Sequence, residues 1–297
     1  MTARPLSPAI AFAVAAGGIG LFSIMDAFMK SLTLALGVYN ALAWRTALSA
    51  MLGGVAWKAS GGGWPSRRAA RLHLLRGAIT AVMALLFFWG LARVPMAQAI
   101  ALSYIAPLLA LLLGAVALGE RVGARTVGAS VAALGGVAII MAGHRSAALG
   151  PEAFLGAVAI LVSAVLYAVN LVVARVQSQA ARPGEIAFFQ SAIVAGLLLL
   201  AAPWLLVVPP TGEYWKIACG AALATASLFL LAWAYAHGET GYLATTEYTS
   251  FVYAAVLGWL AFGERVATTT LLGAAVIVAA CLYAARRRPA KVLEVAA

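Results

Sequence analysis

Polar and ionisable side chains recur at helical spacing inside an apolar stretch of the C-terminal half. Tyr242, Thr246, Thr249 and Tyr253 follow one another at intervals of 4, 3 and 4 residues, which places them on one face of a helix. Glu247 lies on the adjoining face. Hydroxyls and a carboxylate in this pattern could hydrogen-bond a small molecule. We expect the face to line a solvated cavity, with hydrogen bonding between helices as the alternative.

The overall composition makes such groups informative. The 297 residues are 64% apolar and 10% charged, with a mean hydropathy of +0.99, whereas soluble domains are usually about 25% charged. We therefore predict an integral membrane protein. Its net charge of +11 then indicates orientation in the membrane and not nucleic-acid binding. Cys219 and Cys281 lie in apolar runs and indicate neither a disulfide nor a metal site.

Continuous apolar runs predict transmembrane helices, each of which needs about 20 residues. The runs do not alternate between apolar and polar residues, which excludes a strand barrel. The predicted fold is an all-α membrane protein with ten helices, at residues 9–31, 38–57, 72–92, 96–118, 125–143, 152–174, 186–207, 216–236, 242–262 and 267–285.

The first run contains two opposite charges. Asp26 and Lys30 are four residues apart, so we predict that they pair along one helical turn. The alternative is that Asp26 or Glu247 takes up a proton as part of the protein's activity. A carboxylate inside a membrane is costly, and such a group typically marks a functional site. Arg45, in the second run, either lies near a membrane boundary or pairs with a carboxylate.

Other runs add polar and aromatic candidates for binding a small molecule. Pro107 removes a backbone donor from the fourth run and frees a carbonyl, which either exposes the backbone to a substrate or is a packing kink. In the fifth run, Gly128, Ala132 and Gly136 permit close helix contact, within the chain or between subunits. The candidate substrate-binding residues outside the ninth run are Trp89, Gln98, Ser103, Tyr104, Tyr167, Asn170 and Trp233.

A segment of the first half returns in the second half at a constant offset of 144 residues. Trp89 matches Trp233, Tyr104 matches Tyr248, Gly114 matches Gly258, and Gly119-Glu120-Arg121-Val122 matches Gly263-Glu264-Arg265-Val266. Shared Trp, Tyr and Gly-Glu-Arg-Val residues at one offset indicate an internal duplication.

The duplication predicts two repeats, residues 1–146 and 147–297, each with five spans. Because five is odd, the second repeat must enter the membrane from the side opposite to the first. Lys and Arg are concentrated in alternate connections, which predicts that both termini are cytoplasmic. Inverted repeats are typical of secondary transporters, in which equivalent halves exchange conformations around a central site.

Ten spans, inverted halves and a Pro-containing fourth span followed by Gly119-Glu120-Arg121 resemble the EamA family of the drug/metabolite transporter superfamily. The likeness extends to its YddG-type exporters of aromatic and other apolar amino acids. It implies a basket of helices in which spans three, four, eight and nine surround a central cavity, with spans five and ten set apart. The family often has Pro in the ninth span, where this chain has Phe251, so we do not expect a matching kink there.

These observations predict an exporter in a bacterial-type inner membrane that moves aromatic or other apolar amino acids by alternating access. Tyr and Trp would pack on the apolar part of the substrate. Purines, drugs or other metabolites are the alternative substrates. A membrane-embedded lipid enzyme is disfavoured because the sequence has no recognisable catalytic or metal-ligand motif. The expected partners are the substrate and the lipid bilayer, without a cofactor or a metal; the sequence does not indicate an oligomeric state.

Overall fold

The computed structural model describes residues 8–59, 61–118, 124–146, 151–237 and 243–285. Over these ranges the secondary structure is helical and contains no strand, which confirms the all-α class. The helices are α1 (Pro8–Leu36), α2 (Val38–Ala59), α3 (Arg67–Leu91), α4 (Met96–Ser103), α5 (Ile105–Leu118), α6 (Ala124–Ser146), α7 (Pro151–Gln177), α8 (Pro183–Leu200), α9 (Ala202–Leu205), the 3₁₀ helix η1 (Thr211–Glu213), α10 (Tyr214–His237), the 3₁₀ helix η2 (Ala244–Tyr248), α12 (Thr249–Phe262) and α13 (Thr268–Ala285).

Helix lies in every run that hydropathy selected. Within the described ranges, five segments are long and apolar enough to cross a membrane: Ala9–Leu36, Arg67–Leu91, Met96–Gly114, Pro151–Gln177 and Thr211–His237. Shorter apolar helices cover Val127–Gly143, Gly184–Leu200 and Thr268–Ala284. The count of ten spans and the inversion of the two halves stay predictions.

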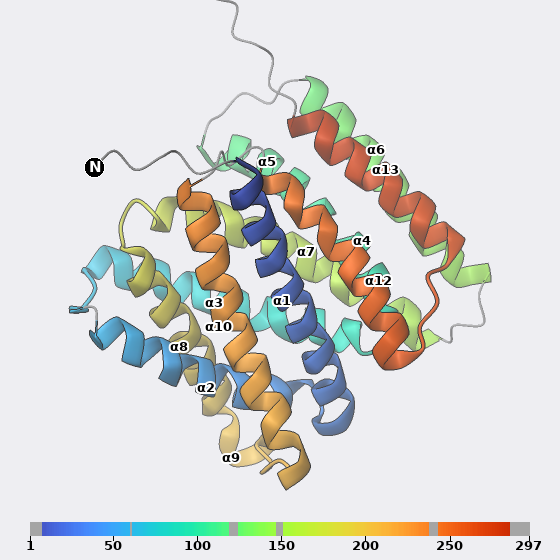
Figure 1. The fold of residues 1–297 in the computed structure, drawn as a ribbon. Helices are drawn as coiled ribbons and strands as arrows, with labels where there is room; N and C mark the ends of the chain where they lie inside the picture. The colour runs from blue at the N-terminus through green and yellow to red at the C-terminus, as the bar shows by residue number, and fades with distance from the viewer. Residues whose placement is uncertain (1–7, 60, 119–123, 147–150, 238–242, 286–297) are drawn as a thin grey trace, which may run out of the picture.

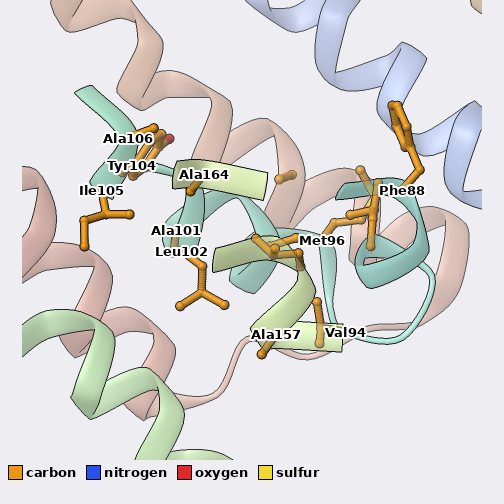
Figure 2. Close-up of a cluster of buried hydrophobic side chains, with 14 of the residues drawn as sticks. Phe88, Val94, Met96, Ala101, Leu102, Tyr104, Ile105, Ala106, Ala157 and Ala164 are labelled. Atoms are coloured by element: carbon orange, nitrogen blue, oxygen red, sulfur yellow. The ribbon is translucent and has the colours of Figure 1, made fainter. Parts of the chain in front are cut away.

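Helices from both halves of the chain are interleaved. α1 packs between α10 and α12, and α3 packs against α7 (Figure 1). A Cβ atom at Gly90 of α3 would lie 2.5 Å from the carbonyl oxygen of Gly156 on α7, so these two helices approach backbone to backbone. The buried core includes Phe88, Met96 and Leu102, whose side chains gather where α3, α4 and α7 meet (Figure 2).

Helices α6 and α13 form a pair at one edge of the bundle (Figure 1). A Cβ atom at Gly136 would lie 2.8 Å from the carbonyl oxygen of Gly273, and the reverse distance is 2.6 Å. The close contact expected of the fifth run is therefore made by Gly136 and lies within the chain. Gly128 and Ala132 do not share in it, because both are exposed.

The fourth predicted span is broken, as its proline suggested. α4 ends at Ser103, Tyr104 forms a turn, and α5 begins at Ile105. Pro107 has no N–H to donate to the Ser103 carbonyl, and its ring crowds that carbonyl. The break therefore appears one turn before the proline.

The ninth predicted span changes geometry at the matching position, although it has no proline. η2 ends at Tyr248 and α12 begins at Thr249. The hydroxyls of Thr246, Thr249 and Ser250 each donate to the carbonyl three residues earlier, at 2.6, 2.6 and 2.5 Å. Such bonds compete with the regular helical ladder. Unlike at Tyr104, however, no turn residue intervenes: α12 follows η2 directly, and both junction residues are in the right-handed helical region. The expectation that Phe251 gives no matching kink stays a prediction.

Candidate functional site

Tyr167 lies within electrostatic range of three polar side chains that come from three other helices. Tyr167 of α7 interacts with Arg76 of α3, Tyr235 of α10 and Glu247 of η2. Tyr167 is 39% exposed, although it lies in the apolar segment Pro151–Gln177, and Glu247, in the predicted ninth span, is also exposed. Polar groups exposed in this way are poor neighbours for lipid chains. We call Arg76, Tyr167, Tyr235 and Glu247 the Arg76–Glu247 group.

Arg76 is oriented by two amide side chains of α7. Its Nε donates to Asn170 Oδ1 at 2.9 Å, and its Nη1 donates to Gln177 Oε1 at 2.7 Å. A guanidinium has about five N–H donors, so several are left for a ligand. Asn170, a predicted binding residue, is 3% exposed and acts here by positioning Arg76.

The hydrogen bonds around Arg76 continue along α3 and onto α8. Gln177 Nε2 lies 2.7 Å from His73 Nδ1, and His73 Nε2 lies 2.9 Å from Glu185 Oε1. In the other direction, Thr80 Oγ1 accepts from Asn170 Nδ2 at 2.5 Å and from Gln190 Nε2. We call this the α3–α7–α8 network. It fixes three helices and the guanidinium with side chains that are mostly neutral amides and hydroxyls.

The predicted polar face of the ninth span divides between different surroundings. Thr246 is fully buried, and its hydroxyl and that of Thr249 are engaged with their own backbone. The Tyr253 ring packs against α1, with its nearest atom 3.3 Å from a Cβ built at Gly20. Glu247, on the adjoining face, is the exposed group, and Tyr242 lies outside the described residues.

Tyr104 connects the turn between α4 and α5 with the junction between η2 and α12. Its hydroxyl lies 2.7 Å from Ser250 Oγ and 3.3 Å from the carbonyl oxygens of Glu247 and Tyr248. The rings of Tyr104 and Tyr248 meet edge to face with centroids 5.3 Å apart. Ser103 donates to its own helix, and Gln98 is buried. In this conformation these fourth-span candidates stabilise the break between α4 and α5.

The two repeated tryptophans each stack with a residue four positions later. The Arg93 guanidinium carbon lies 3.7 Å from the centre of the Trp89 ring, and the His237 ring lies 4.4 Å from the Trp233 ring. Trp233 is 37% exposed, on the same helix as Tyr235. Trp233 therefore lies on α10, the helix that contributes Tyr235 to the Arg76–Glu247 group. Trp89 lies at the opposite end of α3 from Arg76.

Asp26 and Lys30 do not pair. Lys30 Nζ donates to the Glu264 carboxylate and to the Val94 carbonyl oxygen, the latter at 2.6 Å. Asp26 Oδ1 is buried without a hydrogen-bond partner, and its main charged neighbour is Arg45 of α2. The predicted pairing is wrong because the fold offers Lys30 a carboxylate from 234 residues further along the chain. The alternative prediction, that Arg45 interacts with a carboxylate, agrees with the structure.

Two features of this arrangement are not among the predictions from the sequence. Arg76 lies in the third predicted run, and no periodicity marks it as a partner of α7. The second feature is a buried polar face on α1, made of Ser23, Asp26, Lys30 and Thr33. These four residues are spaced by 3, 4 and 3 positions, so the test applied to the ninth span would have found them.

Comparison with known proteins establishes the family. The model of the EamA-like transporter family matches residues 8–142 and 154–286. The chain belongs to the EamA-like transporter family. Family membership makes it a membrane-spanning transporter and not an enzyme.

Two relatives of this EamA-like transporter have named substrates. The pseudopaline exporter CntI of Pseudomonas aeruginosa is 28% identical over 270 residues, which are 90% of this chain and 93% of the relative. The riboflavin transporter of Rhizobium johnstonii is 31% identical over 218 residues, 72% of this chain and 70% of the relative. Neither name supports the YddG type or the aromatic amino acids suggested by the sequence.

A crystal structure of another protein supports the fold of this EamA-like transporter. It superimposes with a TM-score of 0.60 at 22% sequence identity and covers 94% of this chain and 97% of the other. At that identity the likeness concerns the fold alone.

Proposed function

We propose that this EamA-like transporter exports a small zwitterionic metabolite with an apolar or aromatic body, such as an apolar amino acid, by alternating access. The observation that supports it is the Arg76–Glu247 group, in which Tyr167 interacts with an arginine, a second tyrosine and a carboxylate from three other helices. The proposal includes two repeats of inverted topology, residues 1–146 and 147–297, in an inner membrane with both termini cytoplasmic.

Each member of the group suits one part of such a substrate. Arg76 presents N–H donors in the planar arrangement that suits a carboxylate. The Glu247 carboxylate suits an ammonium group. Tyr167 and Tyr235 supply ring faces for the apolar part, and their hydroxyls supply hydrogen bonds. A strongly anionic substrate would meet repulsion from Glu247, so a zwitterion fits the charges better.

Uptake into proteoliposomes tests this proposal. Labelled Phe, Leu and Met should accumulate faster than in protein-free vesicles, and Arg76→Met and Glu247→Gln should each reduce the initial rate at least about tenfold, as expected for loss of a charged contact. Arg71→Met is the matched control, because Arg71 is an exposed arginine of the same helix and should retain the rate. Equal rates with and without protein for all three amino acids would reject the substrate class.

The relatives favour a second candidate, another metabolite such as riboflavin. Their names specify pseudopaline and riboflavin. Riboflavin uptake by the same vesicles separates the two candidates. If riboflavin is taken up and the amino acids neither move nor compete with it, the second candidate replaces the first, and the Arg76→Met and Glu247→Gln variants then show whether the same group binds it.

A further inference from the structure

The second Gly-Glu-Arg segment forms a corner that turns Glu264 back onto its own helix. Gly263 ends α12 in the left-handed conformation, with φ of 67°, which glycine adopts without strain. The next N–H, of Glu264, bonds to the Gly258 carbonyl at 3.0 Å. A Cβ at Gly258 would lie 2.5 Å from Glu264 Oε2, so the carboxylate occupies the place where a side chain would be. Both glycines are therefore needed to hold the carboxylate in this position.

The Glu264 carboxylate, which follows α12, bonds to both α1 and the start of α4. One oxygen accepts from Lys30 of α1, and Oε2 accepts from the Met96 N–H, at the first residue of α4, at 2.7 Å. Lys30 also donates to the Val94 carbonyl, in the corner between α3 and α4. The side chains of Lys30 and Glu264 are 5% and 16% exposed. We call Lys30, Glu264 and the backbone of Val94 and Met96 the Lys30–Glu264 clasp.

One helical turn from the clasp lies a second carboxylate, and one of its oxygens has no hydrogen-bond partner. Asp26 lies four residues before Lys30 on the buried polar face of α1 and is 3% exposed. Its Oδ1 accepts no hydrogen bond. A buried carboxylate that is not fully paired is costly, and so is a buried ammonium group that has lost its partner. Residues four apart on a helix are close enough to form an ion pair.

We propose that Lys30 exchanges Glu264 for Asp26 when this side of the transporter opens. In the closed state Lys30 holds Glu264 and the α3–α4 corner together. When α12 and α4 move away from α1, the ammonium group swings by one turn to Asp26 Oδ1 and is never left unpaired. The exchange lowers the cost of breaking a buried ion pair, and Asp26 thereby stabilises the open state while Glu264 stabilises the closed one. This rests on alternating access but not on the identity of the substrate.

The exposure of polar side chains near the opposite end of α3 agrees with such a closed state. Glu264 follows the predicted ninth span and lies on the predicted extracytoplasmic side, as do Val94 and Met96. The Arg76–Glu247 group, at the other end of α3, contains the exposed side chains of Tyr167 and Glu247. The structure thus combines a tied end with an end at which polar groups are accessible.

Thiol labelling separates the two roles, because they have opposite signs. The reporter is Ser23→Cys, a buried position of the same α1 face on the far side of Asp26 from the clasp, in a background with Cys219→Ala and Cys281→Ser. A membrane-impermeant methanethiosulfonate is applied to vesicles from the side on which Glu264 lies. Glu264→Gln should raise the labelling rate at least about tenfold by weakening the closed state, whereas Asp26→Asn should lower it by a similar factor.

Two controls make the result specific. Glu213→Gln alters a more exposed ion pair with Lys216 and should leave the rate unchanged. In a Lys30→Met background, adding Asp26→Asn or Glu264→Gln should change the rate by less than about twofold, because both act through Lys30. The proposal is overturned if Asp26→Asn leaves labelling unchanged or raises it as Glu264→Gln does. Labelling needs no substrate, so failure of the uptake assay for amino acids would leave this result intact.

Discussion

Charged side chains are held in different ways near the two ends of α3. Beyond its C-terminal end, the Lys30–Glu264 clasp joins α1, the α3–α4 corner and the end of α12 through one ion pair and two bonds to backbone. Near its N-terminal end, the α3–α7–α8 network spreads its bonds over seven side chains, most of them neutral. A contact concentrated in one pair can be broken by one movement, whereas a distributed network makes a stiff unit. Under the proposed exchange, α1, α4 and α12 are the elements that separate, and α3, α7 and α8 form the frame.

The largest effect on stability should come from removing the cation of the clasp. Lys30→Met leaves the Glu264 carboxylate without its charged partner and should cost about 3 kcal/mol of unfolding free energy. The same substitution at Lys216, whose pair with Glu213 is about one-fifth exposed, should cost less than about 1 kcal/mol. Chemical denaturation in detergent micelles compares the two. Equal losses would show that the clasp is worth no more than a surface pair.

A smaller loss is expected when the clasp is displaced and not deleted. Gly258→Ala places a methyl group 2.5 Å from Glu264 Oε2, so the carboxylate must shift away from the Met96 N–H. The expected cost is about 2 kcal/mol, the order of one charged hydrogen bond. Gly196→Ala is the matched control, because a Cβ there meets nothing within 4 Å, and it should be neutral or stabilising. Thermal denaturation of the purified variants is sufficient to compare them.

The smallest effect should come from the network at the other end. Thr80→Val removes the hydroxyl that accepts from Asn170 and Gln190 and should cost about 1 kcal/mol, because the remaining bonds still hold α3 to α7 and α8. Thr225→Val should cost less, since that hydroxyl bonds only to the carbonyl of its own helix. A loss from Thr80→Val as large as that from Lys30→Met would contradict the contrast between a concentrated and a distributed contact.

The sequence predicted the elements better than the partners. Hydropathy located the helical runs because lipid demands long apolar segments whatever they pack against. Pro107 predicted the break at Tyr104 because its effect on the backbone is local. Periodicity showed which residues share a face of a helix but not what that face meets. Spacing along the helix therefore predicted an ion pair between Lys30 and Asp26, whereas in the fold Lys30 pairs with Glu264.

The polar candidates illustrate the same limit. Thr246 and Thr249 have the spacing of a binding face, yet their hydroxyls turn inward onto carbonyls of the same segment, a choice that depends on the 3₁₀ geometry of η2. Arg76 follows several other arginines at the start of α3, and its bonds to the amides of α7 depend on where α7 lies. Neither outcome leaves a signal in a single sequence.

The tyrosine that spans the two broken helices has a mechanical consequence. The Tyr104 side chain grows from the turn between α4 and α5, and its hydroxyl reaches the junction between η2 and α12. A change of angle at either junction must therefore stretch or release bonds at the other. Tyr104 thus couples the geometry of the α4–α5 turn to that of the η2–α12 junction.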